Sequence, residues 1–352
     1  MARKGTDILR DEPGWRLIPE DALWVRMPRF IGDALMIHEA LAPLRVAGRS
    51  LVAWGPAPVM DLFEGSGTYA ATVADDGKSG AWGMAETLRR HRAGGVINLP
   101  RSTRGLLAGF VARTHIRAGW SEAGGRFLAT HSIPFKGRGD HQVDRYRDVL
   151  ELAFPDLPQA APTAFLPREE ALSQATTLRR ELGLEGPFVA LGLGSAAGVK
   201  RLGTGSWESL ISWLKARGVP HVLLGGTFFE DLAQAEALRT SFPGIPDLCG
   251  KVTLPVTAAL VSQAALTVGN DSALSHLSAA CHTPLVAVFG PTEPRHTAPR
   301  APQVRILRNE SLGCLGCLRL QCPVPGHPCM EGLDPALLTQ AVAAFLSPIG
   351  SL

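Results

Sequence analysis

The 352-residue sequence has little net charge and no long hydrophobic run. Its 35 Lys and Arg residues oppose 32 Asp and Glu residues, so the formal charge is only +3. A balance this close to zero creates no field that would select nucleic acid, and we expect no nucleic-acid partner. No stretch approaches the roughly 20 apolar residues that span a bilayer, and the first residues lack the apolar segment of a signal peptide. We expect a soluble, cytoplasmic protein, with peripheral contact to the inner face of the cytoplasmic membrane left open.

Cysteine is scarce and unevenly distributed. Four of the six cysteines lie between positions 314 and 329: Cys314, Cys317, Cys322 and Cys329. This crowding differs from the disulfide framework of a small secreted domain. Four thiolates on a loop rich in Pro and Gly have the chemistry of a structural zinc site or a single iron site. Reduced structural thiols or a disulfide are the alternative.

The chain does contain a regular alternation of short apolar runs and longer amphipathic or Ala/Leu-rich segments. This βαβ rhythm predicts parallel sheets covered by helices on both faces, and therefore the α/β class. We expect strands at 23–27, 50–54, 94–99, 188–193, 221–224, 265–268 and 285–289. Helices are expected at 32–45, 206–217, 229–240 and 272–281.

The length predicts two domains, because 352 residues exceed one ordinary core. Residues 154–167 carry four prolines and almost no charge, which is typical of a linker. We therefore expect an N-terminal domain at 1–163, with 1–22 as an extension, and a C-terminal domain at 164–352 that includes the cysteine-rich loop 314–329. Ligands of such sheets bind at the carboxyl ends of the strands, here in a cleft between the domains.

The segment VGNDSALSHLSAACHTPLVAVFGPTEP, residues 268–294, indicates an anion site. Asn270 or Asp271 can cap a helix that starts at Ser272, and the small residues of its first turn leave backbone amides uncovered. These amides and the helix dipole favour an anion. His276 lies one turn further and can reach the same anion. A capped helix with a core histidine is the structural alternative.

Two further loops of the second half have polar groups suited to a nucleotide. GLGSAAGVKRLGTG places Lys200 and Arg201 on flexible backbone after a strand, which suits phosphate oxygens. Its spacing is not that of a P-loop. In GGTFFED, residues 225–231, Glu230 and Asp231 start a helix and can accept hydrogen bonds from ribose hydroxyls. Stabilisation of the helix dipole is the simpler alternative for Glu230.

The first half offers a carboxylate and several cations. RMPRFIGD places Asp33 at a helix start near the carboxyl end of the first strand, where an acid can have a purely structural role. Arg101, Arg104 and Arg117 lie in the segment 98–120 and are candidates for phosphates or carboxylates of a ligand. A solvated basic face is the alternative for each of them.

These motifs resemble those of glycosyltransferase family 9, the ADP-heptose:lipopolysaccharide heptosyltransferases, and most closely the heptosyltransferase II branch. Residues 268–294 resemble the family's Gly-x-Asp-[ST]-Gly-x-x-His signature, which ends in Phe-Gly-Pro-Thr-[DE]-Pro. Residues 200–210 resemble its Lys-Arg-Trp-Pro segment, and 225–231 its Gly-Gly-x-x-[DE] turn. The resemblance extends from about Leu23 to the C-terminal helix. It implies a GT-B fold: two Rossmann-like domains whose parallel sheets face a central cleft, with the nucleotide sugar bound mainly by the second.

The resemblance also implies an inverting transfer of heptose, or a similar sugar, from an ADP-sugar to the inner core of lipopolysaccharide. Asp33 would be the general base, and Lys200 with the helix start at 271–276 would stabilise the leaving diphosphate, without a cofactor in catalysis. The implied donor-binding residues are Ser195, Lys200, Arg201, Gly226, Glu230, Asn270, Asp271, Ser272, Ala273, Ser275 and His276. The implied acceptor-binding residues are Arg29, His38, Arg101, Ser102 and Arg104.

The sequence departs from the family pattern at four places. Ile37-His38-Glu39 replaces Thr-Thr-Pro or Ser-Leu-Pro, and Asn98 and Pro100 occur in altered order, so the identity of the acceptor is left open. Leu202 replaces a Trp, and Ala273 replaces a Gly. A different nucleotide sugar, a protein acceptor or a catalytically silent GT-B module that binds nucleotide or glycan are the alternatives. The sequence does not fix the oligomeric state.

Overall fold

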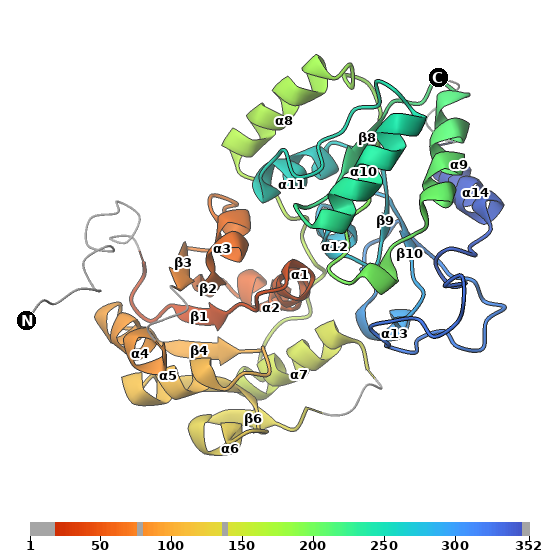
Figure 1. The fold of residues 1–352 in the computed structure, drawn as a ribbon. Coiled ribbons are helices and arrows are strands. Elements are labelled where there is room, and N and C mark those ends of the chain that lie inside the picture. Colours follow the sequence, from red (N-terminus) through yellow and green to blue (C-terminus); the bar gives the residue numbers. More distant parts are fainter. Residues whose placement is uncertain (1–17, 76–79, 136–139, 347–352) are drawn as a thin grey trace, which may run out of the picture. The chain divides into compact units, whose positions relative to one another are not determined.

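The computed structural model describes residues 18–75, 80–135 and 140–346 (Figure 1). Most of the predicted N-terminal extension, residues 1–17, therefore lies outside the described residues. The chain forms two compact units. The first comprises Met1–Arg29, Leu41–Lys136 and Tyr146–Ala161, and the second comprises Phe30–Ala40, Gly137–Arg145 and Pro162–Leu352. The contact pattern thus divides the chain inside the proline-rich segment, and it also assigns two earlier segments to the second unit.

The first unit contains a six-stranded parallel sheet in the order β3-β2-β1-β4-β5-β6. The strands are β1 (Leu23–Arg26), β2 (Leu51–Pro56), β3 (Ala71–Asp75), β4 (Gly95–Asn98), β5 (Ile116–Trp120) and β6 (His131–Ile133). β1 pairs with β2 on one side and β4 on the other, so the strand order reverses between β1 and β4. Polar groups after these two strands leave the same edge of the sheet, where ligands of open α/β sheets bind.

Helices cover this first sheet. They are α2 (Ala42–Val46), α3 (Ala57–Phe63), α4 (Gly80–Arg90), α5 (Arg104–Ala112), α6 (Gly125–Leu128) and the second part of α7 (Gln142–Ala153). Trp24, Val52 and Val96 project from three neighbouring strands into one buried cluster with Met84 of α4 and Ala108 of α5. Alternate residues of a strand point to opposite faces, so continuous apolar runs are needed where both faces are buried.

The second unit contains a five-stranded parallel sheet in the order β11-β10-β9-β7-β8. Its strands are β7 (Val189–Gly192), β8 (His221–Leu224), β9 (Leu266–Asn270), β10 (Leu285–Val288) and β11 (Val304–Leu307). The order reverses between β7 and β9, which pair directly. The predicted strands all form. β3, β5, β6 and β11 were not among the predictions.

Helices lie on both faces of the second sheet (Figure 1). Val189 and Leu191 point toward the side of α9 (Thr204–Lys215), α10 (Phe229–Ser241) and α14 (Pro335–Leu346). Ala190 points to the opposite side, toward α8 (Glu169–Glu181) and α11 (Leu254–Ser262). The remaining helical elements are α1 (Ile31–Ala40), α12 (Ala273–Ala280), α13 (Pro294–Thr297) and the 3₁₀ turn Gly198–Lys200. This three-layer arrangement confirms the predicted α/β class and parallel sheets.

The helix predicted at 32–45 is wrong as a single element. The structure has α1, which ends at Ala40, and α2, which begins at Ala42 with Pro43 in its first turn. Proline has no backbone N–H and fits only the first turn of a helix, so Pro43 starts a new helix. α1 contacts α12 and belongs to the second unit, whereas α2 belongs to the first.

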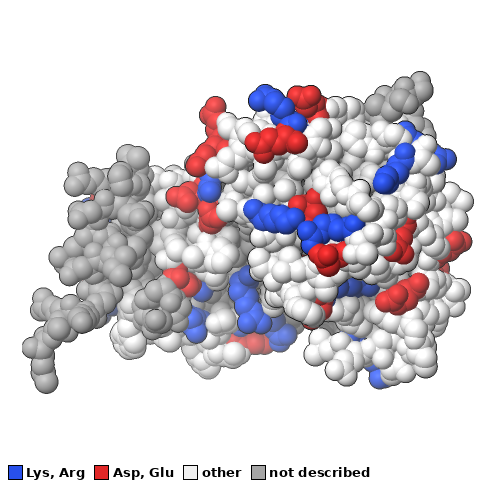
Figure 2. All heavy atoms as spheres, turned by 45° about the horizontal axis from the view of Figure 1, so that its top comes forward, with Lys and Arg blue, Asp and Glu red and all other residues white. Residues whose placement is uncertain are grey.

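Within the described ranges, no helix has the length and hydropathy needed to cross a membrane. On the face drawn in Figure 2, Lys and Arg atoms are intermixed with Asp and Glu atoms in small groups. This distribution agrees with the small net charge of the sequence.

Candidate functional site

The candidate donor site lies at the carboxyl edge of the second sheet, where β7 and β9 are neighbours. The loop after β7 carries the 3₁₀ turn Gly198–Lys200, and the loop after β9 leads into α12. These two segments are far apart in sequence and meet because the strand order reverses between them. This is the position at which open α/β sheets bind nucleotides.

Lys200 and Asp271 form the central ion pair of this edge. Lys200 Nζ lies 2.6 Å from Asp271 Oδ2, and the same oxygen accepts a 2.7 Å hydrogen bond from Thr292 Oγ1. Asp271 is buried, whereas the Lys200 side chain is partly exposed. The lysine is thus held by its own anion, while part of its side chain remains exposed.

Asp33 lies in the electrostatic field of this pair. It belongs to the first turn of α1, within the same compact unit. Burial raises the pKa of Asp33 above its ordinary value, the charge of Lys200 opposes this, and the charge of Asp271 adds to it. No side chain in the described part of the chain forms a hydrogen bond or salt bridge with its carboxylate. The result is a partly buried acid that is influenced by a cation and an anion and has no carboxylate partner among the residues described.

His276 of α12 packs closely against the start of α1. A Cβ atom on Gly32 would lie 2.9 Å from His276 Cδ2, so only glycine allows this close approach. Burial lowers the pKa of His276 to about 4, an effect that Asp271 opposes and that His141 and Lys200 strengthen. The imidazole is therefore neutral near pH 7. It can donate or accept a hydrogen bond, but it does not add positive charge to the anion site.

The predicted capping of α12 by Asn270 or Asp271 is wrong. The N-cap residue is Ser272, and no side chain forms a capping hydrogen bond. The first-turn amides, including that of Ala273, have no intrahelical acceptor. The buried Ser272 hydroxyl has no hydrogen-bond partner among the described residues. The helix start thus offers unpaired donors, as the anion hypothesis requires, but its organisation differs from the expected one.

Three predicted donor-binding residues instead connect backbone segments. The buried Asn270 side chain donates to Leu193 O and accepts from Leu202 N, both at 2.9 Å. The buried Ser275 hydroxyl donates to Asn270 O at 2.6 Å. Ser195 Oγ donates to Ala197 O at 3.1 Å, within its own loop. The polar groups of these residues hold the loops in place and are not free for a ligand in this structure.

Arg201 and Asp231 form a second ion pair that the sequence did not reveal. Arg201 Nε lies 3.1 Å from Asp231 Oδ1, and its terminal nitrogen also donates to Ser195 O. The other oxygen of Asp231 accepts from Gly226 N at 3.0 Å. Asp231 is 1% exposed, whereas the side chain of neighbouring Glu230 is 62% exposed. Arg201 and Gly226 are therefore engaged with Asp231, and Glu230 is the carboxylate that remains accessible to a ribose.

The predicted acceptor residues of the first unit lie after β4. Asn98 Nδ2 donates to Pro100 O and Ser102 O, and this fixes the loop that carries Arg101 and Ser102. Arg101 lies over the ring of Phe135, with 4.8 Å between the guanidinium carbon and the ring centroid. Arg104 is exposed at the start of α5.

Arg26 at the end of β1 is an additional cation of this edge. It contacts Asp75 and Trp54 O, and its pKa is lowered by burial, an effect that the Asp75 carboxylate opposes. The signal available in the sequence was a charged residue that ends an otherwise apolar strand.

The remaining two predicted acceptor residues are Arg29 and His38. Arg29 is exposed at the end of the first segment of the first unit. His38 belongs to α1 in the second unit, where it is buried against Phe165, with 5.7 Å between the ring centroids. It lines a narrow cavity of about 20 Å³ together with His276 and Arg300. A side chain that is buried in this position is not accessible to a large acceptor.

The four clustered cysteines line one cavity of about 170 Å³, together with His327 and Val199. All six cysteines are free thiols. Burial raises the pKa of Cys329 to about 11, and the other three thiols of the cluster add to this. Among the described residues, no three His, Cys, Asp or Glu side chains are arranged to hold a metal ion. The donor chemistry suits zinc or iron, which was one of the alternatives for this cluster, and in this structure the four cysteines are free thiols.

The cysteine loop does support the donor edge. Gly316 N donates to Gly290 O at 3.1 Å, and Leu318 N donates to Pro291 O at 2.7 Å. The two residues whose carbonyl groups accept these hydrogen bonds, Gly290 and Pro291, immediately precede Thr292, which contacts Asp271.

The chain is similar to known proteins over most of its length. Residues 81–327 match the sequence profile of glycosyltransferase family 9 (heptosyltransferase). Over 229 residues the chain is 29% identical to lipooligosaccharide heptosyltransferase 2 of Haemophilus influenzae, a match that covers 60% of this chain and 64% of that protein. The chain therefore matches a little less than two thirds of the length of this relative.

Two solved structures have a similar fold. The ADP-heptose lipopolysaccharide heptosyltransferase II of Escherichia coli superimposes with a TM-score of 0.79 at 21% identity, covering 93% of this chain and 99% of that one. A family 9 glycosyltransferase from Veillonella parvula gives a TM-score of 0.81 at 20% identity, covering 94% and 99%. These similarities confirm the predicted GT-B fold class. Because the family profile matches well over half of the residues, the chain belongs to glycosyltransferase family 9, the heptosyltransferases.

Proposed function

We propose that this protein transfers a heptose from ADP-heptose to a sugar hydroxyl of the lipopolysaccharide core, with inversion at the anomeric carbon. The name of the E. coli relative gives ADP-heptose as its donor and lipopolysaccharide as its acceptor. In this proposal, the second unit binds the donor and the first unit binds the acceptor.

The chemical step needs one base and one stabilised leaving group. Asp33 takes the proton of the acceptor hydroxyl as its oxygen attacks the anomeric carbon. The bond between this carbon and the β-phosphate oxygen breaks, and ADP leaves with an additional negative charge. Lys200 and the unpaired amides at the start of α12 stabilise this charge as it develops. Direct displacement inverts the anomeric centre without a covalent enzyme intermediate.

One observation carries this proposal: Asp33 is partly buried, has no hydrogen-bond or salt-bridge partner for its carboxylate in the described ranges, and is affected by the charges of both Lys200 and Asp271. A carboxylate kept only for the helix dipole would not need burial beside an ion pair. A raised pKa makes it a stronger base once it is ionised. A silent nucleotide-binding module would have no use for such a group.

The decisive experiment measures ADP release from ADP-heptose with and without a lipopolysaccharide core acceptor. Asp33→Ala and Asp33→Asn should lower the acceptor-dependent rate about 10²- to 10⁴-fold, the usual contribution of a general base. The affinity for the donor, measured by calorimetry with ADP, should change little. Native-like turnover by both variants would show that another group is the base.

The identity of the donor is tested separately. ADP-, GDP-, UDP- and dTDP-sugars are compared by thermal shift, because a ligand that binds only the native state raises the melting temperature. We expect the largest shift with ADP-heptose. A larger shift with another nucleotide would favour the alternative of a different donor, and a native enzyme that binds a nucleotide sugar but never releases ADP would favour the silent module.

A further inference from the structure

The positive charge of this protein is concentrated in one short segment of the first unit. Residues 100–135 contain five arginines and a single acid, Glu122, which gives a local charge of +4 with neutral histidines. The whole chain carries only +3, so all other residues together carry about −1. The single acid is engaged with the backbone, because its carboxylate accepts a hydrogen bond from Phe135 N at 2.6 Å.

The same segment exposes large apolar side chains. Leu107 and Phe110 on α5 are 38% and 50% exposed, and Phe127 on α6 is 84% exposed. Leu107 and Phe110 are three residues apart and thus lie on the same side of α5. Single exposed apolar residues are common, but three on two adjoining helices of a strongly basic segment form a patch.

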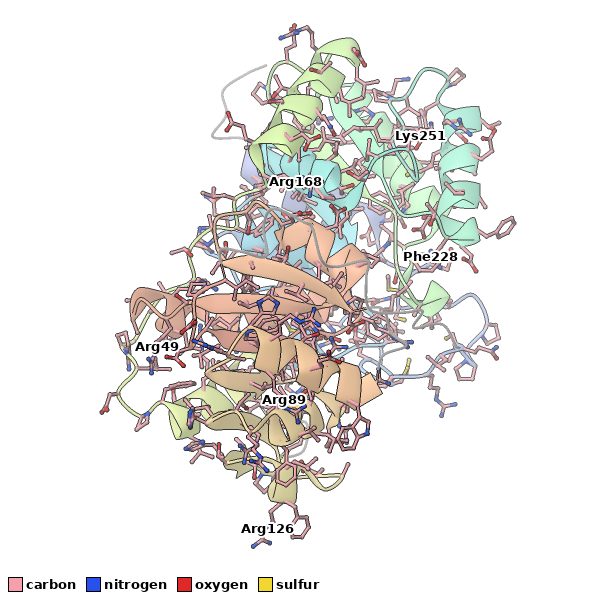
Figure 3. The ribbon with its side chains drawn as sticks, turned by 90° about the vertical axis from the view of Figure 1, so that its left-hand side faces the viewer. Arg49, Arg89, Arg126, Arg168, Phe228 and Lys251 are labelled. Atoms are coloured by element: carbon pink, nitrogen blue, oxygen red, sulfur yellow. The ribbon has the colours of Figure 1, made fainter. Side chains whose placement is uncertain are left out.

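Direct contacts bring these residues together. α5 and α6 are in contact. The Arg117 guanidinium lies 5.7 Å from the centroid of the Phe110 ring, and its Nε donates to Leu128 O at the end of α6 at 2.6 Å. Arg117 therefore links Phe110 to the helix that carries Phe127. Arg113 follows α5 and is exposed. Arg126 of α6 is also exposed and points away from the ribbon (Figure 3).

We propose that Leu107, Phe110, Arg113, Arg126 and Phe127, the basic–apolar surface, dock the protein on an anionic lipid bilayer. Arginines at such a surface meet lipid phosphates, while leucine and phenylalanine enter the boundary between headgroups and acyl chains. Both halves of this chemistry are needed, because a single weak anchor gives only marginal membrane binding. Nucleic acid would use the arginines and leave the apolar side chains in water.

The inference rests in part on the proposed function, because a glycolipid acceptor lies in a membrane. The basic–apolar surface is continuous with the acceptor loop, since Arg104 begins the helix that carries Leu107 and Phe110. Docking would therefore hold the loop with Arg101 and Ser102 close to the headgroup region. Vesicle binding itself requires neither donor nor acceptor, so the two proposals can fail independently.

The test is flotation of the full-length protein with vesicles of phosphatidylglycerol mixed with phosphatidylcholine, compared with phosphatidylcholine alone. We expect binding to the anionic vesicles that weakens as salt is raised. Phe127→Ser should weaken binding about tenfold through lost apolar burial. Arg126→Gln should weaken it about fivefold, which corresponds to about 1 kcal/mol per arginine near an anionic surface.

Matched controls lie in the second unit. Phe229→Ser removes an equally exposed phenylalanine (81%) from α10, and Arg180→Gln removes an exposed arginine from α8. Both should bind vesicles like the native protein. The proposal is overturned if the native protein ignores anionic vesicles, if it binds phosphatidylcholine equally well, or if Phe127→Ser and Arg126→Gln bind no more weakly than the controls. Displacement from vesicles by double-stranded DNA at equal phosphate would also overturn it, in favour of a nucleic-acid surface.

A second readout separates docking from chemistry. Phe127→Ser should transfer sugar normally to a water-soluble, delipidated core acceptor and poorly to the same acceptor embedded in vesicles. Equal rates on both acceptors would contradict docking and leave the proposed function intact. If the native protein binds vesicles but transfers to neither acceptor, docking stands and the proposed function fails.

Discussion

The carboxyl edges of the two sheets carry similar cations in opposite electrostatic settings. In the second unit, Lys200 and Arg201 each contact a buried carboxylate. In the first unit, Arg101 lies over an aromatic ring, and neither it nor Arg104 forms a salt bridge with any described residue. The edge of the second unit is thus organised in advance by internal ion pairs. At the edge of the first unit Arg26 is paired with Asp75, but Arg101 and Arg104 present positive charge that an anionic ligand would neutralise. This difference suits a small diphosphate donor on one side and a large, variable anionic acceptor on the other.

Among the ion pairs of the second unit, we expect the largest loss of stability when Asp231, the partner of Arg201, is replaced. Asp231→Asn removes the buried anion of Arg201 and weakens the contact with Gly226 N. Arg201 then keeps only the exposed Glu230 carboxylate, 3.9 Å away. Removing one partner of a buried ion pair costs about 3–5 kcal/mol. The free energy of unfolding, measured by urea titration, should fall by this amount. Glu230→Gln is the matched control: its neighbouring carboxylate is exposed, so we expect a change within about 0.5 kcal/mol. Equal effects of the two variants would refute the structural role of Asp231.

Lys200 tests whether the same edge also stabilises the leaving group. Lys200→Ala should lower kcat for ADP release about 10²- to 10³-fold, the usual cost of removing one preorganised group that meets developing charge. Lys251→Ala removes an exposed lysine elsewhere in the second unit and should leave kcat unchanged. A Lys200→Ala enzyme with normal kcat and only a raised donor KM would assign the lysine to donor binding alone.

At the carboxyl edge of the first sheet, Arg101 and Arg104 form no salt bridge with any described residue. We therefore expect substitutions there to have a different effect. Arg104→Gln should raise the acceptor KM about 10- to 100-fold, because a hydrogen bond to a charged group contributes roughly 1.5–3 kcal/mol. The donor KM and the melting temperature should not change, since Arg104 is exposed and has no acidic partner among the described residues. Steady-state kinetics with each substrate varied in turn provides the measurement. A rise in the donor KM would contradict the separation of the two edges.

Much of the donor edge was predictable from the sequence, because local patterns determine it. Strand ends followed by Gly, Ser and charged residues located the loops that carry Lys200 and Asp271. The pairing of acids and cations was not predictable. Two adjacent carboxylates at a helix start point about 100° apart, and the sequence does not say that Asp231 faces inward while Glu230 faces water.

The placement of α1 could not be predicted for a related reason. Its sequence neighbours lie in the first unit, but it packs on α12 of the second. This contact depends on Gly32 and His276, which are far apart in the chain and whose fit is apparent only in three dimensions. Asp33 was therefore expected on the acceptor domain, whereas the structure groups it with the donor edge.

The carboxylate of Asp33 should lower the stability of the folded protein near pH 7, whereas the carboxylates of Asp231 and Asp271 should raise it. Its pKa is raised in the folded protein, so its contribution to stability is present below its unfolded pKa, near 4, and is lost as the pH rises through its folded value. Asparagine mimics the neutral form and carries no such pH dependence. Asp33→Asn should therefore match the native melting temperature at pH 4 and exceed it at pH 7, by no more than about 2–4 °C.

Thermal unfolding of native protein and variant at the two pH values measures this small effect. Asp271→Asn is the contrasting variant, because it removes the charged partner of Lys200 and should lower the melting temperature at pH 7. If Asp33→Asn is also less stable than the native protein at pH 7, then Asp33 has a structural partner in solution and is not held ready as a base. If it is more stable but inactive, the carboxylate is retained at a cost in stability, which is expected of a catalytic group and not of a helix-capping acid.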